Sequence, residues 1–253
     1  MDWWPAEFEP YGLTHLAVFV GWTLTIAAIV TLGRRWRGTP REAALRRACG
    51  VVLLASQTWY VVHGALEPNG FEPAMDIPLH VCDIGAWIAG IAMLMPSLRW
   101  AQTVTFFWGY ALTTQAFVTP TVKVGPADAV YWLYWLQHGG LVGTAVYIGA
   151  VGRYRPRPRD AAALLLATAA LLIAAVPINA TLGSNYVWIG DTDPDSRTVF
   201  DVLGPWPRRA FLIVLIAHAV MALVWAVTLL VTSRRPDPAI RAVPSQENAE
   251  AAA

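Results

Sequence analysis

Seven long apolar stretches constrain this chain more than any other feature of its sequence. A helix that crosses the roughly 30 Å hydrocarbon core of a bilayer needs about 20 consecutive, mainly apolar residues. Candidate stretches of that kind cover residues 13–32, 48–66, 78–95, 101–118, 130–151, 161–182 and 210–232. In lipid every backbone polar group must be satisfied internally, and a helix achieves this within one segment. The sequence therefore predicts an all-α polytopic membrane protein, with one seven-helix transmembrane domain over residues 1–235.

The composition supports this class and argues against others. Of the 253 residues, 56% are hydrophobic and only 14% are charged. There are too few charges to coat a soluble surface, which makes a nucleic-acid-binding domain a poor fit. Both cysteines, Cys49 and Cys82, lie inside apolar stretches, which excludes a disulfide framework and a CxxC-type zinc site. We predict no cofactor and no metal, and we expect residues 236–253, which lack apolar periodicity, to form a disordered cytoplasmic tail.

The basic residues set the predicted orientation. Lysine and arginine collect on the cytoplasmic side of a membrane protein, and fourteen of the eighteen basic residues fall in the first, third and fifth loops and the tail. The chain starts with acidic residues and no lysine or arginine, which is typical of a retained first span and not of a cleavable signal peptide. We therefore predict an N-terminus outside, a cytoplasmic C-terminus and an odd number of spans, in the inner or plasma membrane of the cell.

Polar side chains inside the predicted spans share one depth. Such side chains are costly in lipid, so each is a functional hypothesis by default. On this topology, ten of them fall in the outer half of their spans: His15, His63, His80, Cys82, Asp83, Gln115, Gln137, His138, Asn179 and His218. Apart from the spans that contribute only His15 or His218, five spans contribute polar groups at one level, and this predicts a pocket open to the outer leaflet. His15 and His218 have no sequence neighbours that suggest chemistry, and we interpret both as structural.

Cys82 is the candidate nucleophile. It lies near the start of a span, after a proline, where unpaired backbone N–H groups favour a thiolate. In a regular helix His80 lies about 200° around the axis from Cys82, so it cannot readily act as the base, whereas it can pair with Asp83 three residues later. The base must come from another span. His138 is the best candidate, because the two glycines that follow it let a neighbouring helix or a substrate approach closely.

These residues belong to a set of motifs that resembles a known family. The motifs are Pro78-Leu79-His80-Val81-Cys82-Asp83, Phe107-Trp108-Gly109 followed by Gln115 and Thr119-Pro120, His138-Gly139, Asn179 with Gly183-Ser184-Asn185-Tyr186, and Asp201-Val202-Leu203-Gly204-Pro205-Trp206-Pro207. The set resembles the YwaF-like bacterial integral membrane proteins, which are related to a multi-pass animal family that acylates ether phospholipids. The resemblance covers residues 78–207 and implies that Cys82 and His138 are a catalytic pair. We then expect Trp108, Asn185 and Tyr186 to contact substrate.

The working hypothesis is acyl transfer between (lyso)phospholipids of the membrane. Cys82, with His138 as base, attacks a fatty acyl ester, and a lysophospholipid hydroxyl resolves the thioester. Four further polar residues are expected to orient these groups or to stabilise the oxyanion: His80, Asp83, Gln115 and Asn179. Acyl-CoA is cytoplasmic, so a site in the outer leaflet takes its acyl group from another phospholipid.

Two other functions stay open. Histidines with a nearby aspartate suit zinc in a seven-span lipid hydrolase, although each ligand would have to come from a separate helix. A non-catalytic carrier or receptor, whose polar layer binds a lipid or small solute, predicts that Cys82→Ser retains function.

The connection before the last span, residues 179–207, is long and rich in apolar residues. Loops of that length are usually functional or disordered, and the apolar content favours order. We expect it to fold over the outer mouth of the pocket, with Trp188 and Trp206 pointing inward. The alternative is an interfacial segment that lies among the lipid headgroups.

Overall fold

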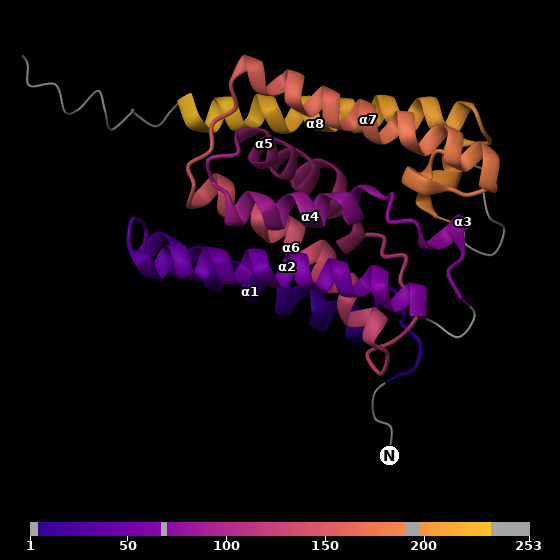
Figure 1. Cartoon of the computed structure of the whole chain (residues 1–253), viewed down its shortest axis with the longest axis horizontal. Coiled ribbons are helices and arrows are strands. Elements are labelled where there is room, and N and C mark those ends of the chain that lie inside the picture. The colour runs from indigo at the N-terminus through magenta and orange to yellow at the C-terminus, as the bar shows by residue number, and fades with distance from the viewer. Residues whose placement is uncertain (1–4, 67–69, 191–197, 234–253) are drawn as a thin grey trace, which may run out of the picture.

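The computed structural model describes residues 5–66, 70–190 and 198–233, and over that part of the chain the fold is all-helical (Figure 1). Seven helices carry the architecture: α1 (Leu13–Arg35), α2 (Pro40–Leu66), α4 (Val81–Leu94), α5 (Arg99–Trp108), α6 (Ala129–Ala150), α7 (Pro158–Leu182) and α8 (Arg208–Ser233). Shorter turns join them: α3 (Pro73–Asp76), a π-helical turn η1 (Gly109–Thr113), and the 3₁₀ turns η2 (Thr114–Phe117), η3 (Tyr186–Trp188) and η4 (Val199–Leu203). The predicted all-α class is confirmed for the described residues, and the predicted tail lies outside them.

A helical segment occurs in each of the seven predicted ranges, but some helices differ from those ranges in extent. Helix α2 begins at Pro40, well before the predicted start at residue 48. Proline is favoured in the first turn of a helix, where its missing N–H is not needed. Glu42 and Arg46 then form an ion pair at 3.4 Å, one turn apart. The polar first turns were predicted as a loop because hydropathy reports only the part of a helix that suits lipid.

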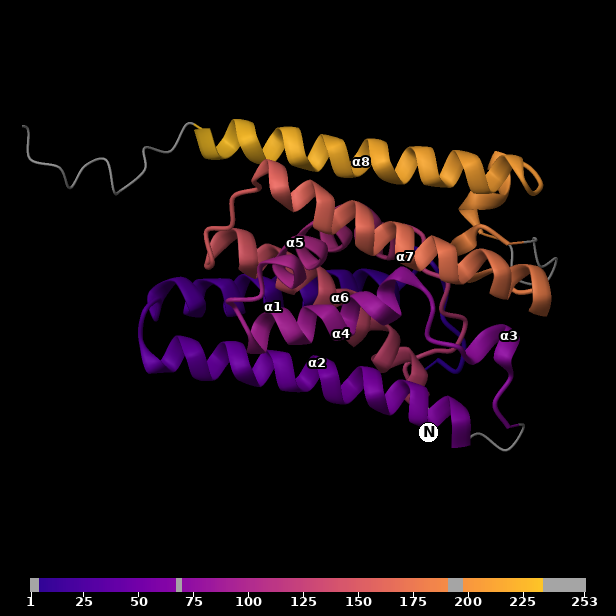
Figure 2. The same ribbon diagram turned by 45° about the horizontal axis from the view of Figure 1, so that its top comes forward.

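The helices form a central group flanked on two sides. In Figure 1, α1 and α2 lie on one side, α7 and α8 on the opposite side, and α4, α5 and α6 between them. Figure 2 also shows α2 and α8 on opposite sides. Four helices in the described part are long and apolar enough to cross a membrane, namely the flanking helices α1, α2, α7 and α8. Helix α4 is apolar but has only 14 residues. The central helices face protein on most sides, so they can carry more polar residues than helices that face lipid.

The connections alternate between the two ends of the bundle. At one end, the Arg37 guanidinium donates to the Ala150 carbonyl at 2.8 Å and so joins the α1–α2 turn to the end of α6. At the other end, the Phe8 N–H donates to the Lys123 carbonyl at 2.9 Å, and the Tyr186 hydroxyl donates to the Pro73 carbonyl at 2.8 Å. Segments far apart in the sequence thus meet at the same end.

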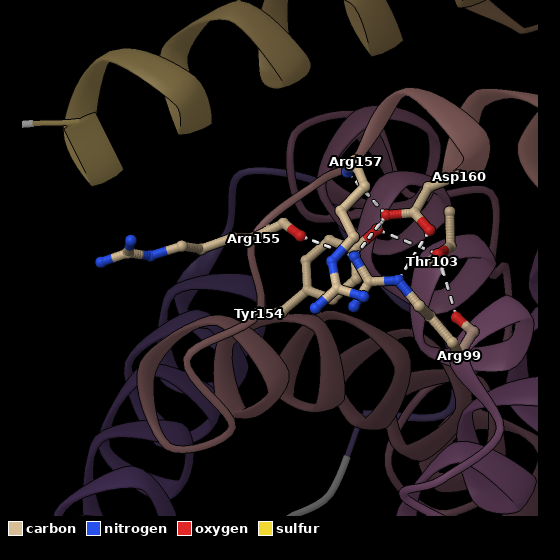
Figure 3. A network of polar contacts seen from close by, with 6 residues as sticks. All are labelled: Arg99, Thr103, Tyr154, Arg155, Arg157 and Asp160. Atoms are coloured by element: carbon tan, nitrogen blue, oxygen red, sulfur yellow. Dashed lines mark hydrogen bonds and ion pairs between the residues drawn. The ribbon is translucent and has the colours of Figure 1, made fainter. Parts of the chain in front are cut away.

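A polar network closes the end that carries the arginine-rich turns (Figure 3). Arg99 at the start of α5 donates from Nε to Asp160 Oδ1 at 2.7 Å and from Nη2 to Oδ2 at 2.5 Å. Bidentate pairs of this kind are stronger and more directional than single ones. The Tyr154 hydroxyl also donates to Asp160 Oδ2 at 3.1 Å. Burial raises the pKa of Tyr154, which keeps this donor protonated. The network fixes the start of α7 against α5.

Glycines bring α6 against its neighbours. A Cβ on Gly139 would overlap the indole of Trp22 on α1, and a Cβ on Gly140 would overlap Leu53 on α2. The predicted close approach of neighbouring helices at these glycines is therefore confirmed. Side chains of α1 and α2 fill the space, and this fixes the rotation of α6 about its axis.

Candidate active site

A cavity of about 710 Å³ lies among the central helices and is lined by residues of α2, α4, α6, α7 and α8 together with η1 and η2. Nine of the polar or aromatic residues singled out in the sequence line it: His63, His80, Cys82, Asp83, Trp108, Gln115, Gln137, His138 and His218. The size falls within the roughly 300–1,000 Å³ of ordinary ligand pockets. His15 lies elsewhere. Its two ring nitrogens bond to the Tyr11 N–H and the Phe117 carbonyl, both at 3.0 Å, which confirms a structural role.

Cys82 and His138 lie at matching levels of two packed helices. Their immediate chain neighbours are hydrogen-bonded, because Gln137 Nε2 donates to Asp83 Oδ1 at 2.7 Å. Three residues further along each helix, a Cβ on Gly85 would lie 2.7 Å from Leu141 Cδ2, so α4 and α6 are in close contact there as well. Both contacts advance along the two helices in the same direction. The cysteine lies just before both contacts on α4, the histidine lies between them on α6, and both residues line the cavity.

Hydrogen bonding fixes the chemistry of the His138 ring. Its Nδ1 lies 2.7 Å from the Tyr134 carbonyl oxygen. A carbonyl only accepts, so Nδ1 carries the proton of the neutral ring and Nε2 keeps its lone pair. The Tyr134 ring lies beside the imidazole, with ring centroids 4.1 Å apart, and restricts its rotation. The bond to Tyr134 therefore orients the His138 ring and leaves Nε2, the nitrogen that can accept a proton, outside this contact.

Asp83 belongs to a buried polar cluster. Its Oδ1 accepts from Gln137 and its Oδ2 accepts from the His80 backbone N–H at 2.9 Å. The predicted pairing of His80 with Asp83 therefore occurs through the backbone at the start of α4. Gln137 Nε2 also donates to Gln57 Oε1 at 2.7 Å, and Gln57 is 1% exposed. The sequence analysis missed Gln57, although an amide inside the apolar part of α2 was the available signal.

Asn179, Asn185 and Tyr186 do not line the cavity. Asn179 Oδ1 accepts from the Tyr186 N–H at 2.8 Å and from the Ser184 hydroxyl at 2.9 Å, and its Nδ2 donates to the Tyr186 carbonyl at 3.0 Å. Asn185 Oδ1 accepts from the Gly190 N–H at 2.9 Å. The Asn179 and Asn185 side chains bond within the loop, so they position the loop instead of facing the cavity.

Tyr186 joins this loop to the start of α4. Its hydroxyl accepts from the Ile77 N–H at 2.9 Å and donates to the Pro73 carbonyl, and burial raises the pKa of the Tyr186 phenol, which keeps the donor protonated. The His80 ring packs between loop rings, with centroids 5.3 Å from Tyr186 and 5.1 Å from Trp188. The loop thereby sets the position of His80 above Cys82.

The described parts of the 179–207 loop cover the cavity, as predicted. The residues that line it from this loop are Val187, Trp188, Ile189, Phe200 and Leu203. Buried Arg209 holds the two parts together, because it pairs with Asp201 at 2.7 Å and also donates to the Gly190 carbonyl. The prediction for Trp206 was wrong, since 57% of it is exposed. The stretch Gly204 to Pro207 leads into α8 at the surface and leaves this indole outside.

The structure adds cavity residues that sequence reasoning missed. Tyr60 lies on the same face of α2 as His63, three residues away, and Tyr134 lies one turn before His138. Both line the cavity beside Cys82. The helical spacing to a predicted polar residue was the signal for each. His218, interpreted as structural, also lines the cavity, with its Nδ1 bonded to the Val214 carbonyl at 2.7 Å.

A metal site has little support from the ligand geometry. Within the described ranges, no three His, Cys, Asp or Glu side chains group in a way that could hold a metal ion. The zinc hydrolase alternative would need at least three protein ligands around one ion.

Comparison with known proteins supplies the family. A family model described as the TMEM164 family matches residues 10–225, which include α1 and most of α8. The chain belongs to the TMEM164 family. Family membership and the four long apolar helices together make it a multi-pass membrane protein. No curated protein matches the chain, and no solved structure matches it either. The match to the TMEM164 family covers every residue that lines the cavity.

Proposed function

We propose that this member of the TMEM164 family is an integral membrane acyltransferase that moves a fatty acyl group between (lyso)phospholipids. The observation that carries the proposal is the register of α4 and α6. The Asp83–Gln137 hydrogen bond joins the chain neighbours of Cys82 and His138, and the Gly85–Leu141 contact lies three residues after Cys82 and His138 on the two helices. Cys82 and His138 both line the cavity. A thiol and an imidazole at one level of a cavity are the parts that nucleophilic acyl transfer needs.

The reaction proceeds in two balanced steps. His138 Nε2 takes the proton of the Cys82 thiol, and the sulfur attacks the carbonyl carbon of a phospholipid ester. The carbon–oxygen bond breaks, His138 returns the proton to the leaving oxygen, and a lysophospholipid departs. In the second step an acceptor hydroxyl gives its proton to His138 and attacks the thioester. The thiolate leaves and is reprotonated, so neither water nor an oxidant is consumed.

Two of the predicted supporting residues suit the oxyanion. Gln115 and His80 line the cavity, so either can donate a hydrogen bond to the developing negative charge. Loss of one such donor costs about 10²–10³ in rate. Asn179 has a different part in the proposal, because its amide is engaged with Tyr186 and Ser184. It positions the loop that covers the site. Trp108 donates to Thr168 Oγ1 at 3.1 Å and presents its ring to the cavity.

We further propose seven spans, with the N-terminus outside and the C-terminus in the cytoplasm. The alternating connections and the fourteen basic residues on one side support this topology. Helix α4 is short for a span, but Ile77, Pro78 and His80 before it line the cavity, and non-helical backbone at membrane depth is tolerated in such a place. The site then faces the outer half of the plasma or inner membrane, which favours a phospholipid over acyl-CoA as donor.

The test is lipid analysis of cells that overproduce wild type, Cys82→Ala or Cys49→Ala. Cys49 does not line the cavity and serves as the matched control. Wild type and Cys49→Ala should shift the acyl composition of phospholipids in the same way, and Cys82→Ala should resemble the empty vector. A Cys82→Ala protein that is present at normal levels and shifts the lipids like wild type would favour a non-catalytic lipid-binding protein.

A further inference from the structure

The residues that line the cavity differ in polarity between the two sides of the bundle. On the side of α2 and α6 the lining is polar and includes Tyr60, His63, Gln137 and His138. On the side of α7 and α8 it is mainly aliphatic: Leu171, Leu172, Ile213, Val214, Ile216 and Val220. The polar exceptions there, Thr168 and His218, are bonded to the Trp108 indole N–H and to the Val214 carbonyl. Helices α2 and α8 lie on opposite sides of the molecule in both views (Figures 1 and 2). The cavity is therefore divided into a polar arm and an apolar arm, with Cys82 on α4 between the helices that form them.

The apolar arm borders the surface of the bundle that faces lipid. Helix α8 packs mainly on η1, η4 and α5 and makes little close contact with α7. Figure 2 shows α7 and α8 diverging toward the end that carries α3. Ile216 of α8 lines the cavity while 47% of the residue is exposed. The boundary between α7 and α8, called the seam below, is therefore loosely packed, and Ile216 of α8 belongs both to the cavity lining and to the exposed surface.

The roof of this arm is also apolar, which favours entry from the side. Trp188 and Phe200 stack with ring centroids 6.0 Å apart, and both line the cavity with Leu203. An apolar roof and apolar walls offer few partners to a polar headgroup, and burial of polar groups without partners is costly. They suit a hydrocarbon chain, whose burial is stabilised in proportion to its apolar area.

We propose that the apolar arm binds a fatty acyl chain of the phospholipid, which enters sideways from the bilayer through the seam between α7 and α8. This assignment rests on the proposed acyl transfer and adds the direction in which the substrate lies. The headgroup then occupies the polar arm beside α2 and α6, and the ester reaches Cys82 between them. Ala217 is a small residue of α8 in the cavity lining, so a larger side chain at this position should obstruct the apolar arm.

The test compares Ala217→Trp with Ala219→Trp. Both alanines lie on α8, but Ala219 is exposed and does not line the cavity, so the second variant controls for an added indole in the membrane. Each is made in a Cys82→Ala background, so that no turnover occurs during the measurement. The protein is placed in vesicles of phosphatidylcholine that contain a phosphatidylcholine with a diazirine at the end of one acyl chain. Photolabelled positions are then mapped by peptide mass spectrometry.

The expected result is labelling of Leu171, Leu172 and Ile213. This labelling should fall by about tenfold in Ala217→Trp, which corresponds to about 1.4 kcal/mol of weaker chain binding, and should be unchanged in Ala219→Trp. Ala217→Leu, a smaller intrusion, should give an intermediate loss, and it keeps the test decisive if the tryptophan variant fails to fold. Labelling by the chain end at Tyr60 or His63 instead would overturn the proposal. So would labelling that is the same with alanine, leucine or tryptophan at position 217.

The two proposals fail separately. If wild type shows no acyl transfer while chain-end labelling maps to α7 and α8 and responds to Ala217→Trp, the apolar arm stands and the enzymatic function falls. If wild type transfers acyl groups but the label maps to α2 and α6, the function stands and the direction of the substrate is wrong.

Discussion

Asn179→Ala should release the loop that covers the cavity. The Asn179 amide makes three hydrogen bonds within this buried turn, two to the Tyr186 backbone and one to the Ser184 hydroxyl. A typical intramolecular hydrogen bond contributes about 1 kcal/mol net, so the variant should lose about 3 kcal/mol of local stability. Since about 1.4 kcal/mol is a factor of ten, local opening becomes about 10²-fold more frequent.

Hydrogen–deuterium exchange of the purified protein in lipid nanodiscs measures this directly. The Tyr186 amide is itself a donor to Asn179, so it reports the opening of the turn. Its exchange should quicken by about 10²-fold, whereas amides in the middle of α6 should be unaffected. Ser184→Ala removes one of the three bonds and should quicken exchange by only about fivefold. If Tyr186 exchanges at the wild-type rate in Asn179→Ala, the amide does not hold the loop and the reasoning is refuted.

Three further predictions concern the bundle. Gly139→Ala should lower the melting temperature, because the new Cβ would overlap the rigid Trp22 indole. Gly21→Ala, whose Cβ would meet nothing within 4 Å, should be neutral or slightly stabilising. Equal melting temperatures for the two variants would contradict the packing of α1 on α6. Arg99→Ala should be more destabilising than Arg159→Ala in a thermal scan, because Arg99 makes the bidentate contact to Asp160 while Arg159 is exposed; indistinguishable scans would argue against the network. Reporter fusions in the α6–α7 turn and at the C-terminus should both read as cytoplasmic, and an extracytoplasmic reading at either position would reverse the proposed orientation.

The sequence predicted the helices well because hydrophobic periodicity and length carry that information. All seven predicted ranges contain a helical segment. The early start of α2 at Pro40 was missed, since its first turns are held by a polar contact and not by apolar residues. The shortness of α4 was missed for a related reason. Residues 78–80 continue the apolar pattern of the span but are not helical, and Pro78 and His80 line the cavity.

The candidate site was predictable in part. Costly polar groups at one depth correctly indicated a shared cavity, and the need for a base outside α4 indicated α6. The pattern could not show which polar side chains face the cavity and which are used internally. The Asn179 side chain bonds to the backbone of Tyr186. Gln57 accepts a hydrogen bond from Gln137 only because α2 packs on α6. These contacts depend on the rotation of each helix about its axis, and the glycine contacts of α6 that fix it appear only in the tertiary structure.

Acyl transfer by this site requires a covalent acyl intermediate on Cys82, and capture of that intermediate tests the proposed function. Purified protein in nanodiscs is given a phospholipid labelled in the acyl chain and is quenched in acid within one turnover. We predict a hydroxylamine-labile thioester on the peptide that contains Cys82. It should form in Cys49→Ala at the wild-type rate, and in His138→Ala at least about 10²-fold more slowly than in wild type. Label on Cys49, label retained by Cys82→Ala, or no thioester in protein that demonstrably transfers acyl groups would contradict it.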